Sequence, residues 1–182
     1  MKKILAGQVL LILCCAFYLV WWYRGYRPGT SVNRVGGLNG VLLFITAALG
    51  IAGIVCSLGR IEAKTEPKID PSTILVVGLI AYFVLMIVTR YAFRRIVTTE
   101  LLLIVGWCVL EMTVINRLFA GGILSGGGFA AMCVVLAAAF LISMVLYVAY
   151  YRMEEMKAFY AAMIPLITEA LSMAVLTGIV LI

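Results

Sequence analysis

Residues 94–117, RRIVTTELLLIVGWCVLEMTVINR, have the length and composition of one bilayer crossing. A membrane helix needs about 20 predominantly apolar residues. Arginines flank this run, and Glu111 lies in its apolar middle. A charge at that depth costs about 2.5–3.5 kcal/mol on insertion scales, so an intramembrane carboxylate marks a candidate functional site by default. The stretch therefore predicts a transmembrane helix that carries such a site.

The composition of the whole chain extends this prediction. Of its 182 residues, 65% are hydrophobic and 12% are charged, whereas soluble domains are about 45–50% apolar and about 25% charged. We predict an all-α, polytopic integral membrane protein with a single transmembrane domain, residues 1–182. Its six expected spans are residues 4–22, 36–58, 71–93, 99–118, 129–151 and 159–182. Five spans are the alternative, if the fifth and sixth merge or if one segment is re-entrant.

Local signals set several of the span boundaries. Asp70 followed by Pro71 is typical of an N-cap and a first helical residue, so it predicts the start of the third span. Residues 119–128 are glycine-rich, which favours a tight hairpin turn over a re-entrant piece. Residues 150–160 contain neither Gly nor Pro, so the boundary between the last two spans stays open. The first apolar run is too long for a signal peptide, and we expect it to be retained.

Missing residue types exclude several chemistries. The chain has no histidine, which excludes His-ligated haem, His-containing zinc sites and Ser-His-Asp triads. Asp70 is the only aspartate, and the five cysteines form no CxxC pair. We therefore expect no cofactor and no metal site. The net charge of +6 comes from short connections that suit the lipid bilayer's headgroups, so we expect no nucleic acid partner. The Lys and Arg are distributed too evenly to fix the orientation of the termini.

Two carboxylates within apolar spans are the main functional candidates. Spacings of seven and four residues place Glu100, Trp107 and Glu111 on one helical face. Glu169 lies in the last span, one turn after Pro165, where a proline within the helix would kink it. The predicted solute- or ion-binding residues are Glu111, Glu169, Trp107 and Ser172. The alternative is that each carboxylate is paired inside the bundle, for instance with Arg90, Arg117 or Asn39.

A basic connection follows the first span. Arg24, Arg27 and Arg34 lie close together around a Pro-Gly turn. They are candidates for binding an anionic headgroup or another anion. The alternative is an ordinary basic loop at the membrane surface.

These features predict a small membrane protein that binds or translocates a small solute, a proton or a cation. One alternative is a non-catalytic helical subunit, or a homo-oligomer, that packs through Gly/Ala-rich faces at residues 47–53 and 137–139. A second alternative is a lipid-modifying enzyme with a Glu pair. Catalysis is the less favoured reading, because no GxSxG or Asp-rich motif is present. The expected location is the bacterial cytoplasmic membrane.

Overall fold

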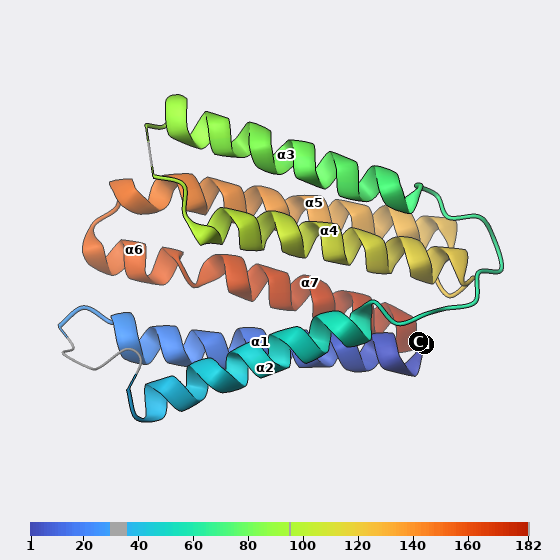
Figure 1. Ribbon diagram of the computed structural model, residues 1–182, viewed down its shortest axis with the longest axis horizontal. Coiled ribbons are helices and arrows are strands. Elements are labelled where there is room, and N and C mark those ends of the chain that lie inside the picture. The colour runs from blue at the N-terminus through green and yellow to red at the C-terminus, as the bar shows by residue number, and fades with distance from the viewer. Residues whose placement is uncertain (30–35, 95, 182) are drawn as a thin grey trace. The chain divides into compact units, whose positions relative to one another are not determined.

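The computed structural model describes residues 1–29, 36–94 and 96–181, and every regular element in these ranges is helical. Six helical segments are long and apolar enough to cross a membrane (Figure 1). The all-α class is thus confirmed, and the six helices match the six predicted spans in number, length and apolar composition. The elements are α1 (Lys2–Tyr26), α2 (Leu38–Ser57), α3 (Pro71–Tyr91), α4 (Thr99–Ala120), α5 (Gly126–Ala149), the 3-10 turn η1 (Tyr150–Arg152), α6 (Glu155–Ala161) and α7 (Ile164–Leu181).

The helices group into two compact units. Met1–Gly59 and Ala149–Ile182 form the terminal unit, which contains α1, α2, η1, α6 and α7. Arg60–Val148 forms the central unit, which contains α3, α4 and almost all of α5. The carboxylates predicted from sequence fall one in each unit, Glu111 in the central unit and Glu169 in the terminal unit.

In the terminal unit, α1 and α2 are antiparallel and approach closely through glycine. A Cβ added at Gly7 would lie 2.4 Å from the backbone nitrogen of Ser57, and one added at Gly53 would lie 2.8 Å from Leu11. Small residues allow this approach because apolar lipid gives helices no hydrophobic reason to associate. Part of the small-residue face of α2 is therefore used within the unit. The alanines at 47, 48 and 52 stay exposed.

The last span is interrupted. Helix α6 ends at Ala161, α7 begins at Ile164, and Pro165 is the second residue of α7. A continuous helix kinked at an internal proline was expected, and that expectation is wrong. Proline has no N–H and is tolerated in the first turn of a helix, where backbone N–H groups have no helical acceptor anyway. The chain therefore restarts its helix at the proline.

In the central unit, α3, α4 and α5 share an apolar core. Leu101, Ile104 and Val105 of α4 are buried with Tyr147 of α5. A Cβ added at Gly78 of α3 would lie 2.2 Å from a methyl group of Val109, so Gly78 makes room for α4. Asp70 caps α3 by accepting a hydrogen bond from the backbone nitrogen of Thr73 at 3.3 Å. The predicted start of this helix is confirmed.

The turn between α4 and α5 is a hairpin. Gly122 has φ +69°, and its nitrogen donates to the carbonyl of Phe119 at 2.8 Å. The nitrogen of Ile123 donates to the carbonyl of Leu118 at 2.9 Å. Together these bonds form a Schellman motif, which satisfies carbonyls at a helix end. The hairpin prediction is confirmed.

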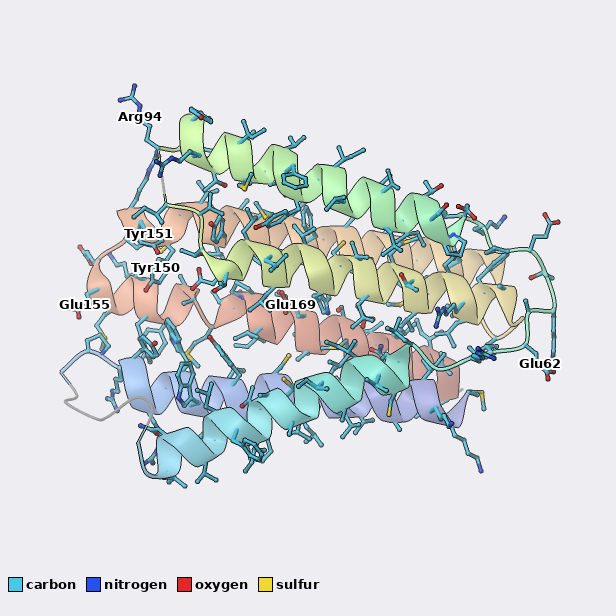
Figure 2. All side chains as sticks on the ribbon, viewed as in Figure 1. Glu62, Arg94, Tyr150, Tyr151, Glu155 and Glu169 are labelled. Carbon is cyan, nitrogen blue, oxygen red and sulfur yellow. The ribbon has the colours of Figure 1, made fainter. Side chains whose placement is uncertain are left out.

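The fifth and sixth spans are separate. After η1, Met153 and Glu154 adopt extended backbone conformations before α6 begins. Figure 2 labels Tyr150, Tyr151 and Glu155 around this connection. Merging of the two spans, the other route to a five-span protein, is therefore wrong.

The segment between α2 and α3 forms hydrogen bonds with the end of α4 in the central unit. Most of its residues are exposed. However, the nitrogens of Lys64 and Thr65 both donate to the carbonyl of Ala120, at 2.8 and 3.0 Å. Ala120 is the last residue of α4, where backbone carbonyls have no helical donor. The loop supplies donors to that helix end.

Candidate functional site

Trp107 and Glu111 lie one turn apart on α4 and are both buried. Glu111 is 2% exposed and Trp107 is 9% exposed. Glu100, on the same helical face, is exposed at the start of the helix, where its carboxylate accepts a hydrogen bond from the Thr98 hydroxyl at 3.2 Å. Thr98 is the N-cap residue, but its side chain makes no capping bond. The predicted polar face is thus buried at the middle of the helix and exposed only at its beginning.

Two buried polar atoms of the central unit lack hydrogen-bond partners within the described ranges. They are the indole nitrogen of Trp107 and the hydroxyl oxygen of Ser143, whose side chain is 0% exposed. An indole N–H only donates, whereas a hydroxyl donates and accepts. Buried polar groups are nearly always hydrogen-bonded, so each exception requires an explanation, such as a bound molecule or water.

The packing of α4 against α5 places Ser143 near the level of Trp107. At one end, the nitrogen of Thr98 donates to the Tyr147 hydroxyl at 3.3 Å. At the other end, the rings of Phe119 and Phe129 are 5.4 Å apart. The two helices therefore run antiparallel along their length. Counted from these two contacts, Ser143 and Trp107 differ by about 3 to 8 Å along the helix axes, because each helical residue advances about 1.5 Å.

Sequence reasoning missed Ser143, because its burial becomes apparent only from the packing of α5. The buried residues of α5 recur every three or four positions, at Met132, Leu136, Ala139, Ser143 and Tyr147. Ser143 is the only serine or threonine in that otherwise apolar helix. A hydroxyl on the buried face of a membrane-type helix is a polar group that needs a partner.

Glu169 and Ser172 lie together on α7. Glu169 is 8% exposed and Ser172 is 4% exposed. The Ser172 hydroxyl donates to the backbone carbonyl of Glu169 at 2.8 Å, and the Thr168 hydroxyl donates to the carbonyl of Pro165 at 2.8 Å. Because their protons are already used by the helix, these hydroxyls offer a bound molecule an acceptor. Figure 2 labels Glu169 part-way along the segment made by α6 and α7.

The predicted anion-binding arginines have contacts within the terminal unit. The Arg24 side chain donates to the side-chain oxygen of Asn39 at 3.3 Å, which joins the end of α1 to the start of α2. The Arg27 guanidinium lies 5.3 Å from the centre of the Tyr23 ring, a cation–π distance. Both arginines are exposed, so binding of an anionic headgroup stays a prediction. Arg34 lies outside the described residues.

At the break in the last span, Trp22 makes a hydrogen bond that sequence reasoning missed. The Trp22 indole nitrogen donates to the carbonyl of Phe159 at 3.4 Å. In a continuous helix that carbonyl would accept from residue 163, but the nitrogen of Met163 donates to Tyr160 instead. Trp22 also stacks on Tyr26 with ring centres 4.3 Å apart. Trp22 therefore satisfies a carbonyl that the break releases.

The fold places this protein among all-helical proteins, with six helices that are long and apolar enough to cross a bilayer. No family model, no curated protein and no solved structure with which the chain was compared matches it. In the described ranges, no group of three or more His, Cys, Asp or Glu side chains is placed to hold a metal ion. Function must be inferred from the buried polar residues themselves.

Proposed function

We propose that this is an integral protein of the bacterial cytoplasmic membrane that binds, or carries across the membrane, a small cationic solute or a proton through its intramembrane carboxylates. One observation carries the proposal. Glu111 is almost completely buried in the middle of a helix long enough to cross a bilayer, one turn from a buried indole N–H that has no acceptor in the described ranges.

The energetics of a buried carboxylate support this function. An ionised carboxylate removed from water loses its hydration, which costs several kcal/mol unless another charge or several hydrogen bonds replace it. A proton or a bound cation neutralises the group. A carboxylate at this depth is therefore suited to hold a cation or a proton and to release it when the site meets water.

Glu169 is the second carboxylate of the proposed function. It lies in the second turn of α7, six residues after Met163 at the helix break. Transporters use interrupted membrane helices to build ion and solute sites, because backbone groups at a break are available to ligands. We propose that Glu169 and the acceptor oxygen of Ser172 form a polar centre on this helix.

Proton or cation movement in liposomes tests the proposal. The purified protein is reconstituted into vesicles containing a pH-sensitive dye, and a potassium, sodium or proton gradient is imposed. Glu111→Gln should abolish the protein-dependent change in dye signal, and Glu169→Gln should reduce it. Glu100→Gln is the matched control, because it makes the same change on the same helical face where the side chain is exposed. Equal signals from Glu111→Gln and the unaltered protein would contradict the proposal.

A further inference from the structure

The end of α1 carries two arginines whose side chains are held in place. Arg24 lies in the last turn of α1, and Arg27 directly follows the helix. The Nε atom of Arg24 donates to the side-chain oxygen of Asn39 at 3.3 Å, and the Arg27 guanidinium lies 5.3 Å from the centre of the Tyr23 ring. Residues three apart on a helix have Cβ atoms about 5–6 Å apart. The two guanidinium groups are therefore exposed neighbours with restricted movement.

The hydrogen bond to Asn39 uses only one N–H group of Arg24. A guanidinium has five N–H donors. Arg24 forms no ion pair with a carboxylate in the described ranges, and its side chain is exposed. The planar guanidinium group binds phosphate oxygens through two parallel hydrogen bonds. Arg24 can thus bind a phosphate group while it keeps its hydrogen bond to Asn39.

From the arginines towards the middle of α1, the exposed face of the helix is apolar. Val9, Leu13 and Val20 are 46%, 42% and 49% exposed. With the exposed Ala16 they recur every three or four residues, so they lie on one face, and a spacing of seven places Arg27 on the same face as Val20. From Val9 to Val20 this face extends about 16 Å, close to half the thickness of the hydrocarbon core of a bilayer. The surface therefore has the length of one lipid acyl chain, with two arginines at its end.

We propose that this exposed face of α1 binds one anionic glycerophospholipid. Its phosphate lies between Arg24 and Arg27, and one acyl chain lies along Val20, Ala16 and Leu13. The inference goes beyond the proposed function and uses neither intramembrane carboxylate. Charge complementarity selects the headgroup, because two guanidinium groups favour a net negative charge over a headgroup that carries its own cation. The apolar face selects a lipid over a free phosphate ion, because only a lipid has a chain to cover it.

Native mass spectrometry of the full-length protein in detergent tests the assignment by resolving each bound lipid. Dioleoyl phosphatidylglycerol and dioleoyl phosphatidylcholine present an anionic and a zwitterionic headgroup on the same chains. The first phosphatidylglycerol should bind about tenfold more tightly than the first phosphatidylcholine, as expected for one hydrogen bond between charged groups. Arg24→Gln should remove most of this preference, and Arg27→Gln should reduce it. Arg90→Gln is the matched control, because Arg90 is an exposed arginine in the last turn of another span, α3.

The acyl chain is tested separately from the headgroup. Leu13→Gln should weaken phosphatidylglycerol binding about threefold, because the chain loses apolar contact. Leu103→Gln makes the same change at a 64% exposed leucine of α4 and should leave binding unchanged. Glycerol 1-phosphate, which has the phosphate but no acyl chain, should not displace the bound phosphatidylglycerol.

Three results would overturn the assignment. The unaltered protein could bind both lipids equally, which would exclude selection by charge. Arg24→Gln and Arg27→Gln could both retain the full preference, which would place the anionic lipid elsewhere. Glycerol 1-phosphate could displace the lipid, which would mean that the arginines take a free phosphate. If Arg24→Gln fails to fold, Arg27→Gln decides, because it leaves the hydrogen bond between Arg24 and Asn39 in place.

Discussion

The side-chain amide of Asn116 holds the backbone of Ile69 at two points. The amide nitrogen donates to the carbonyl of Ile69 at 2.6 Å, and the amide oxygen accepts from the nitrogen of Ile69 at 3.2 Å. Ile69 directly precedes the N-cap of α3, and Asn116 lies in the last two turns of α4. This pair therefore fixes the start of α3 against α4, in the register that places Gly78 on Val109.

Asn116→Leu should destabilise the central unit. The change removes both hydrogen bonds, and unmade backbone donors and acceptors cost about 1–3 kcal/mol each when buried. We expect a loss of about 2 kcal/mol in the free energy of unfolding, measured from denaturant titrations followed by circular dichroism in detergent. Asn116→Asp retains the acceptor but loses the donor and adds a charge at a position that is 2% exposed, so it should destabilise the unit at least as much. Equal stability of Asn116→Leu and the unaltered protein would show that the pair does not hold α3.

Gly7→Ala should separate α1 from α2. The new methyl group would lie 2.4 Å from the backbone nitrogen of Ser57, which cannot rotate away as a side chain can. Overpacking of this kind costs about 1–3 kcal/mol. Thermal unfolding of Gly7→Ala is compared with that of Gly178→Ala, where a Cβ meets no atom within 4 Å among the described residues. The control should melt at or above the temperature of the unaltered protein, and a similarly mild effect of Gly7→Ala would contradict the close approach.

Trp22→Phe should loosen α6 more than it disturbs the rest of the terminal unit. Phenylalanine keeps the stacking on Tyr26 but cannot donate to the carbonyl of Phe159. We expect faster amide hydrogen exchange over residues 155–161, measured by mass spectrometry, with little change in α2. Trp22→Leu also removes the ring and should have a larger effect. Unchanged exchange in both variants would exclude a role for Trp22 in holding the helix break.

Acid should weaken the start of α3 through Asp70. The pKa of this carboxyl is lowered from 3.8, first by the hydrogen bond from the Ser72 hydroxyl and then by backbone nitrogens of the same turn. A group whose pKa is depressed in the folded state adds stability above its unfolded pKa, and that stability is lost as the pH falls through the folded value. The melting temperature of Asp70→Asn should therefore differ most from that of the unaltered protein above about pH 4. A difference that stays constant from pH 6 to pH 2 would exclude this contribution.

The spans were predictable because they depend on local composition. Long apolar runs, the Asp70–Pro71 start signal and the glycines after residue 120 each determine a boundary without distant contacts. A kink at Pro165 was expected, whereas the helix is interrupted at residues 162–163. The position of Pro165 in the sequence does not say whether the helix bends around it or restarts at it. In the structure α6 ends before it, and the carbonyl of Phe159 that this releases accepts from Trp22, 137 residues away in the chain.

The candidate site was predictable only in part. Glu111, Glu169 and Ser172 are buried as their positions in apolar spans suggested, and Trp107 is buried beside Glu111. Ser143 required the packing of α5 to be known, because a single serine in an apolar helix can equally face a partner helix or lipid. The hydrogen bond between Arg24 and Asn39 could not be predicted either. The two residues lie on different helices, and the sequence does not show how the connection between these helices folds.

The most direct test of the central claim, that Glu111 holds the cation, is infrared difference spectroscopy of the protein in lipid. The spectrum is recorded as the pH of the solution washed over the sample is lowered, and again as its sodium or potassium concentration is raised. We predict a change in carboxyl absorption that vanishes in Glu111→Gln and persists in Glu100→Gln. A carboxyl signal that is the same in Glu111→Gln as in the unaltered protein would contradict the account and leave Glu111 a structural residue.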